Sequence, residues 1–130
     1  GVIDLIHKMS KEYTLALTSS SSRIEVELIT KEFDLDTVFK VIITGDDVKK
    51  GKPDPEPYQI TCEKLGLLTS ECVVIEDSKS GVQSAKQAGC FVIGVTTTHN
   101  EYDLSKADVV VDSFEQIDKK LLISLIEKNT

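Results

Sequence analysis

Glu76 and Asp77 place two negative charges side by side directly after the apolar run "VVI" at 73–75. Like charges at the end of a buried strand repel each other unless a cation or a set of hydrogen-bond donors holds them. Two carboxylates without His or Cys nearby suit magnesium, which takes one or two protein carboxylates and keeps several waters. The alternative is that Asp77 or Ser78 only caps a following helix.

Two further polar clusters have residue types that bind anions. Lys52 lies between Gly51 and Pro53 in "GKPDPEPY", so its backbone has little freedom to lose when the ammonium engages a partner. Ser19 and Ser20 begin a run of four serines, and hydroxyls and free amides at a helix start can hold phosphate. Taken singly, the lysine is also consistent with an ordinary turn, and the serines with simple helix capping.

Alternating strands and helices are expected to position these residues. Short runs rich in Val, Ile or Thr predict five strands, at 13–18, 40–44, 72–76, 91–96 and 108–112. Segments with helical periodicity lie around them, at 1–12, 22–33, 55–67, 80–90 and 113–127. In the segment 22–33 the residues that fall on one apolar stripe are Ile24, Leu28, Ile29 and Phe33. The order predicts an α/β fold of one domain over residues 1–130, a doubly wound, mostly parallel sheet covered by helices on both faces.

The three polar clusters should then meet at one edge of the sheet, because ligands bind at the carboxyl ends of parallel strands. An anion-binding hydroxyl, a fixed lysine and a metal-binding acid pair are the parts needed to bind a phosphoryl group and disperse its charge during transfer. We therefore expect Ser19, Lys52, Glu76 and Asp77 to converge on one site.

Composition excludes several other classes of protein. The chain has 130 residues and a formal charge of −7, which disfavours nucleic acid or an anionic membrane as a partner. The sequence has no apolar run long enough to span a bilayer and no signal-peptide pattern at its start, so we expect a cytoplasmic protein. The three cysteines occupy unrelated positions and are expected to be reduced core residues.

In order and spacing, "LALTSSSSR", "GKPDPEPY" and "VVIEDSKSGVQSAKQAG" resemble the second, third and fourth motifs of the haloacid dehalogenase superfamily, nearest its β-phosphoglucomutase-like phosphatases. The resemblance implies a Rossmann-like core and a magnesium-dependent phosphatase or phosphomutase acting on a small phosphorylated metabolite through an aspartyl-phosphate. It implies that Ser19 and Ser20 contact the phosphate, that Lys52 stabilises the phosphorylated intermediate, and that Glu76 with Asp77 holds magnesium.

One expected motif of that family has no counterpart. Its nucleophile and its acid/base are two aspartates in a D-x-D motif after the first strand, and "DLD" at 34–36 lies instead beyond a helix. The family's first strand, which lies mid-sheet, and its helical cap are also missing. We expect the 130-residue chain to be the C-terminal part of such an enzyme and inactive alone, with the missing N-terminal segment or a second copy of the chain as a possible partner. Alternatives are a non-catalytic binding module or subunit, or a receiver-like phosphoacceptor domain, although receivers place their lysine after their acids.

Overall fold

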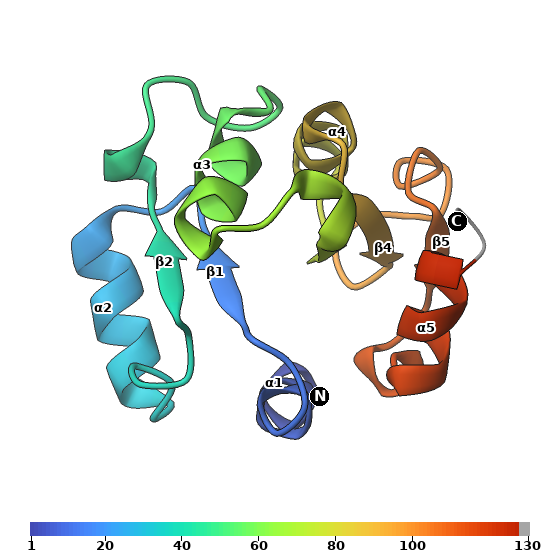
Figure 1. The fold of residues 1–130 in the computed structure, drawn as a ribbon, viewed down its shortest axis with the longest axis horizontal. Helices are drawn as coiled ribbons and strands as arrows, with labels where there is room; N and C mark the ends of the chain where they lie inside the picture. The colour runs from blue at the N-terminus through green and yellow to red at the C-terminus, as the bar shows by residue number, and fades with distance from the viewer. Residues whose placement is uncertain (128–130) are drawn as a thin grey trace.

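The computed structural model describes residues 1–127, which alternate between helices and short strands as the sequence predicts (Figure 1). The strands are β1 (Ala16–Thr18), β2 (Val41–Ile43), β3 (Val73–Glu76), β4 (Phe91–Val95) and β5 (Val109–Val111). The α-helices are α1 (Val2–Ser10), α2 (Arg23–Glu32), α3 (Glu56–Leu65), α4 (Lys79–Ala88) and α5 (Lys119–Glu127). Three short 3-10 helices complete the fold: η1 (Gly45–Asp47), η2 (Thr69–Glu71) and η3 (Phe114–Gln116). All five predicted strands are confirmed, each shorter than expected.

The strands form two separate parallel sheets. β1 pairs with β2, with Leu17 opposite Ile42, and the second sheet has the order β3-β4-β5. Figure 1 shows β1 and β2 in the left half of the view, and β4 and β5 in the right half. The α/β, parallel fold class is confirmed, and the two sheets stay apart instead of closing into one.

Several helices begin at a side chain that caps the first turn or end at a glycine. The Ser22 and Ser78 hydroxyls cap α2 and α4 by accepting hydrogen bonds from the Glu25 and Gly81 amides, respectively. Gly66 ends α3 with a φ of 72°, a left-handed conformation that suits glycine. The segment 113–127, predicted as one helix, is broken between η3 and α5, because Ile117 turns into the core and Asp118 restarts the helix by accepting from the Leu121 amide.

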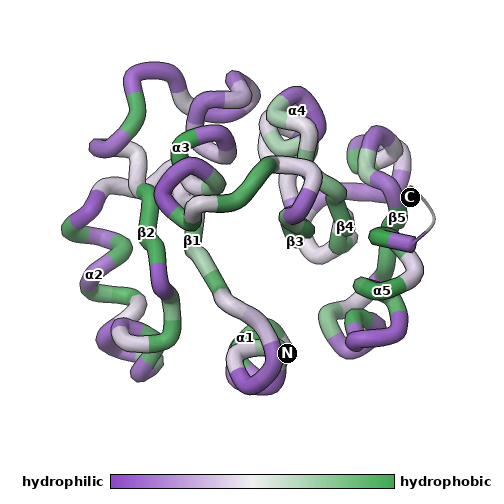
Figure 2. The backbone as a smooth tube through the Cα atoms, in the orientation of Figure 1, coloured by the Kyte–Doolittle hydropathy of each residue, from purple (hydrophilic) through white to green (hydrophobic). Residues whose placement is uncertain are grey.

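Two apolar cores cover the two faces of the larger sheet. Val92 of β4 packs against Tyr58, Cys62 and the helix α4 on one face. Its neighbours Ile93 and Val95 pack against α1 and α5 on the other face. The side chains of all three β4 residues are fully buried, as alternation across a covered parallel strand requires. In Figure 2 the strands are accordingly among the most hydrophobic parts of the chain.

Helices join the two sheets across the space between β1 and β3. The helix α3 contacts β1, β2 and α4, and α1 packs Leu5 and Met9 into the core on the opposite face. The amide of Ser19 donates to Ile43, and the carbonyl of Leu15 accepts from Lys40. The backbone N–H and C=O groups of the alternate residues Ala16 and Thr18 therefore point away from β2. Within the described part of the chain, no strand pairs with that edge of β1.

The apolar stripe that predicted the helix α2 is exposed. Ile24, Leu28, Ile29 and Phe33 are 71%, 65%, 53% and 44% exposed, and the helix instead buries Val26 and Thr30. A threonine can be buried here because its hydroxyl donates to the Val26 carbonyl one turn earlier, which removes most of the cost of desolvation. No helix within residues 1–127 is long and apolar enough to cross a membrane.

Candidate active site

Lys52 connects the ends of the two sheets. Its ammonium donates to the carbonyl of Thr18, the last residue of β1, over 3.1 Å. It also donates to Oε1 of Glu76, the last residue of β3, over 2.5 Å. The Lys52 and Glu76 side chains are only 10% and 8% exposed. The carboxyl ends of β1 and β3 therefore meet around one buried ammonium.

The loop that carries Lys52 is held from both sides. Glu56 at the start of α3 accepts from the amides of Lys49 and Lys50, and its own amide donates to Asp54. The Ser84 hydroxyl of α4 donates to the Asp54 carbonyl over 2.6 Å. The loop thus has a fixed shape, and less conformational freedom is lost when its lysine binds an anion.

Glu76 is the most enclosed acid of the site. Its Oε1 accepts from Lys52 and also from the Tyr58 hydroxyl at 2.5 Å, while Oε2 accepts from the Ser78 hydroxyl at 3.2 Å. Gly81 lies against the carboxylate so closely that a Cβ at this position would overlap it. Burial and the neighbouring carboxylate raise the pKa of the Tyr58 hydroxyl well above its ordinary value, so Tyr58 is a hydrogen-bond donor at neutral pH.

Asp77 is more open than Glu76. Its Oδ2 accepts a long hydrogen bond of 3.4 Å from Thr97, and its carbonyl accepts from the Thr98 hydroxyl. The Thr98 hydroxyl also lies 3.0 Å from Nδ1 of His99, so this loop holds a histidine near the site. Asp77 fits a magnesium ligand, because an oxygen donor with weak protein contacts can turn to a cation.

The donor set as a whole is sparse for a metal. No group of three His, Cys, Asp or Glu side chains within residues 1–127 is arranged to hold an ion. Magnesium commonly takes only one or two protein carboxylates and completes its shell with water and phosphate. Asp77, with Glu76 beside it through Oε2, is compatible with that pattern, and both metal-ligand assignments remain predictions.

The serine loop, residues 19–22, is hydrogen-bonded to the loop that follows β2. The Ser19 hydroxyl accepts from the Ser21 amide, and the Ser21 carbonyl accepts from the Gly45 amide at 2.7 Å. A Cβ at Gly45 would lie 2.5 Å from the Ser20 carbonyl oxygen, so only glycine permits this approach. Ser20 itself is exposed at the surface. The loop is therefore ordered before any ligand binds.

An ionic clamp fastens the same two loops. The Arg23 amide donates to Asp46, and the Arg23 guanidinium donates to Asp47 at 2.5 Å. The amide and hydroxyl of Thr44 also donate to Asp47. Hydrogen bonds from the Thr44 backbone and side chain, together with Arg23, lower the pKa of the Asp47 carboxyl below its usual 3.8.

The structure brings Lys52 and Glu76 into direct contact and places Ser19 and Asp77 next in sequence to the groups that Lys52 joins. Ser20 has no hydrogen bond to any of them among those found in the described residues. Sequence reasoning missed Tyr58 and the carbonyl of Thr18. The phenol of Tyr58 was a usable signal, because a buried hydroxyl needs a partner.

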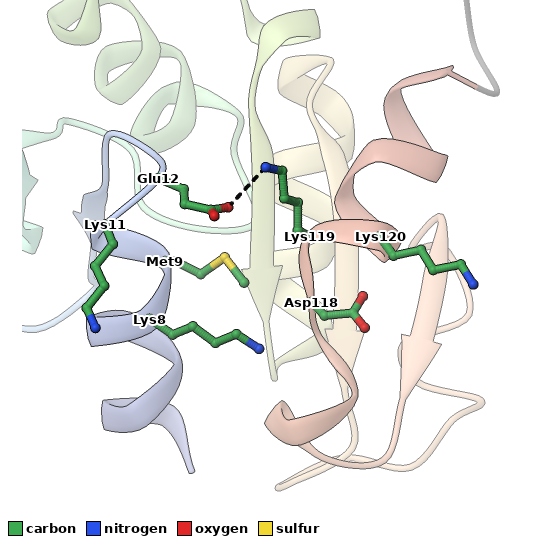
Figure 3. Close-up of a pocket in the computed structure, with 7 residues that line it drawn as sticks. All are labelled: Lys8, Met9, Lys11, Glu12, Asp118, Lys119 and Lys120. Atoms are coloured by element: carbon green, nitrogen blue, oxygen red, sulfur yellow. Dashed lines mark ion pairs between the residues drawn. The ribbon is translucent and has the colours of Figure 1, made fainter.

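A surface hollow of about 370 Å³ lies apart from this site, between α1 and the start of α5 (Figure 3). Glu12 and Lys119 pair across it at 3.5 Å, with side chains 50% and 61% exposed. Lys11 and Lys120 extend away from the hollow in Figure 3. Glu12 precedes β1, whereas Lys52 reaches its carboxyl end. We regard the hollow as a solvated crevice without a part in the chemistry.

Comparison with known proteins gives a consistent family. The profile of the haloacid dehalogenase-like hydrolases matches residues 1–95. The chain is 35% identical over 118 residues to validoxylamine A 7'-phosphate phosphatase of Streptomyces hygroscopicus subsp. limoneus, covering 90% of this chain and 55% of that protein. It is 46% identical over 80 residues to the phosphorylated carbohydrates phosphatase of Thermotoga maritima, covering 62% of this chain and 37% of that one.

Solved structures agree. The β-phosphoglucomutase of Clostridium difficile superposes with a TM-score of 0.85 at 25% identity, covering 99% of this chain and 56% of that one. CbbY of Rhodobacter sphaeroides, solved in complex with phosphate, gives a TM-score of 0.80 at 32% identity, with coverage of 89% and 54%. The chain thus spans about half the length of these relatives. It belongs to the haloacid dehalogenase-like hydrolases, in their β-phosphoglucomutase-like group.

Proposed function

We propose that this chain forms the phosphate-binding and charge-stabilising part of a magnesium-dependent phosphatase or phosphomutase that acts on a small phosphate ester. The observation that carries the proposal is the position of the Lys52 ammonium, buried between the Thr18 carbonyl and the Glu76 carboxylate. The ammonium contacts Thr18, which directly precedes Ser19, and Glu76, which directly precedes Asp77. A phosphoryl group held between these loops would be neutralised in a site of low dielectric.

Each residue has a separate task in this proposal. The Ser19 hydroxyl, with Ser20 beside it, orients the phosphoryl oxygens, and Lys52 offsets the charge that develops on them. Asp77, with Glu76, would hold magnesium, which supplies further positive charge to the phosphoryl group when bound. The clamp between Arg23 and Asp47 keeps the serine loop in place, so binding a phosphate requires no ordering of that loop.

The nucleophile of the proposed reaction comes from outside the 130 residues. A serine needs an adjacent general base, and the described contacts give Ser19 only backbone partners. We propose that a strand ending in a D-x-D motif pairs between β1 and β3 and supplies an aspartate that becomes phosphorylated. In this proposal the strand would come from an N-terminal segment; a second copy of the chain would fill the gap between the sheets but would not supply the D-x-D motif. A cytoplasmic location and a small phosphorylated metabolite as substrate are part of the same proposal.

The substrate class follows the relatives. Their names describe phosphatases of validoxylamine A 7'-phosphate and of phosphorylated carbohydrates. We therefore place sugar phosphates first among the candidate substrates.

Turnover of p-nitrophenyl phosphate with and without magnesium tests the proposal. The 130-residue chain should release no nitrophenol above the blank. A longer chain, with an apolar strand ending in D-x-D ahead of Gly1, should turn over in a magnesium-dependent way, and Lys52→Met should abolish this. Robust turnover by the pure 130-residue chain would refute the external nucleophile. Full activity of Lys52→Met in the longer chain would refute the role of the lysine.

A further inference from the structure

Tyr58 touches the centre of the site although it lies in the core. It occupies the first turn of α3, and only 5% of it is exposed. Its hydroxyl donates to Oε1 of Glu76 at 2.5 Å, and that oxygen also accepts from the Lys52 ammonium at 2.5 Å. One carboxylate oxygen therefore receives two donors, a phenol from the core and the ammonium of the site.

The position of this phenol is determined by packing. The Tyr58 ring belongs to the buried cluster that contains Cys62, Val82 and Leu104. The hydroxyl therefore cannot move far without disturbing the contact between α3 and α4. By contrast, the terminal torsion of a glutamate is soft, and its carboxylate takes many orientations unless hydrogen bonds select one.

The hydrogen bond from Tyr58 to Glu76 thus links the position of the Lys52 ammonium to the packing of the core. Tyr58 fixes Oε1 of Glu76, Oε1 fixes the Lys52 ammonium, and the ammonium reaches the carbonyl of Thr18. The Tyr58 ring centroid also lies 5.2 Å from the Lys52 ammonium, within the range of a cation-π contact. Both contacts draw the ammonium to the same place.

We propose that Tyr58 is a positioning residue for Lys52, acting through a hydrogen bond to the carboxylate that they share. Tyr58 contacts neither phosphate nor metal in this arrangement. Its relevance to catalysis rests on the proposed function, but the arrangement itself does not. If Tyr58 served only to fill the core, phenylalanine would replace it without effect on the lysine.

The reactivity of Lys52 toward acetic anhydride at a single neutral pH tests this, with acetylation of each lysine followed by mass spectrometry. The Lys52 rate is expressed relative to Lys49 and Lys50, which are exposed neighbours on the same loop. In Tyr58→Phe we expect this ratio to rise about threefold or more, because one of the two donors that order Glu76 is gone. Tyr13→Phe removes a hydroxyl from a partly exposed tyrosine and should leave the ratio unchanged.

An unchanged ratio in Tyr58→Phe, with native circular dichroism, would overturn the proposal. If that variant does not fold, the wild-type chain decides through NMR. A slowly exchanging, downfield hydroxyl proton of Tyr58 with a contact to the Lys52 side chain supports the proposal, and a rapidly exchanging hydroxyl refutes it. Neither measurement contains phosphate or metal, so a failure of the proposed activity is seen separately in the turnover assay.

Discussion

At the scale of single residues, Lys52 and Glu76 form a buried ion pair. Removing one partner of a buried ion pair leaves the other charge without compensation, which costs more than the pair itself contributes. Both side chains are at most 10% exposed, so this reasoning applies to them with little screening by solvent. It leads to a test that needs no catalytic activity.

Lys52→Met should lower the free energy of unfolding by about 3 kcal/mol, because the buried Glu76 side chain then lacks its oppositely charged partner. Urea denaturation measures the loss. The double variant Lys52→Met/Glu76→Gln should recover at least half of it, since the amide can still accept from Tyr58. A double variant as unstable as the sum of the two single variants would contradict this account, because it would show that the two side chains are not coupled.

The Asp47 carboxylate is expected to make the stability of the chain sensitive to acid. Its folded pKa is below 3.8, so its carboxylate contributes stability above the ordinary pKa, and this contribution is lost as pH falls through the lowered value. Between about pH 5 and pH 2, the urea midpoint of Asp47→Asn should therefore fall less steeply than that of the wild type. Glu101→Gln, on an exposed loop, is the control and should follow the wild type. Parallel curves for Asp47→Asn and the wild type would show that Asp47 does not contribute to the loss of stability in acid.

At the scale of elements, α2 separates hydrophobic pattern from burial. The helix exposes Ile24 and Leu28 and buries Val26 and Thr30. Leu28→Ser should change the free energy of unfolding by only about 0.5 kcal/mol, because the side chain is already in water. Val26→Ala removes buried methyl groups from the same helix and should cost about 2 kcal/mol. Thermal and urea unfolding of the two variants compare them, and a larger loss for Leu28→Ser would mean that its side chain is covered in solution.

The sequence allowed most elements to be predicted, and α2 shows where such prediction stops. Five apolar runs became five strands, because each is short, β-branched and flanked by turn residues. The stripe on α2 correctly predicted a helix, but periodicity does not show which face of a helix meets the sheet. Here Thr30 satisfies its hydroxyl within the helix, which makes the less apolar face cheap to bury.

The candidate site was partly predictable for the same reason. Ser19 directly follows β1, Glu76 ends β3 and Lys52 lies in the loop beyond β2. Parallel strands bring such positions to one edge. The phenol of Tyr58 indicates that a partner is needed, but that this partner is Glu76 was not predictable, because it depends on how α3 packs. The grouping of Cys62, Cys72 and Cys90 in one core cluster was missed likewise, since their spacing carries no pattern.

At the scale of the whole molecule, two sheets are joined through the helix α3 without sharing a backbone ladder. β4 has a neighbour on each side, whereas within residues 1–127 β1 pairs only with β2. Ile75 of β3 is 37% exposed although its strand lies mid-molecule, as expected where a neighbouring strand is lacking. The β1–β2 unit should therefore open more readily than the three-stranded sheet.

Amide hydrogen exchange under native conditions measures this difference. The amides of β4 should exchange at least about tenfold more slowly than those of β1, because only β4 is buried on both faces and paired along both edges. Exchange at equal rates in β1 and β4 would show that the molecule opens as one unit. A peptide or longer chain that pairs between β1 and β3 should slow the exchange of β1.

The ammonium that spans from Thr18 to Glu76 makes the joint between the sheets and the affinity for anions thermodynamically reciprocal. An anion that attracts Lys52 away from the Thr18 carbonyl weakens the contact between the sheets. The contact in turn weakens binding of the anion, and the two free-energy changes are equal. A strand bound in the space between the sheets would take over the cohesion that Lys52 now provides. The lysine would then be released for its ligand, so that completion of the fold and readiness for the substrate would arrive in one step.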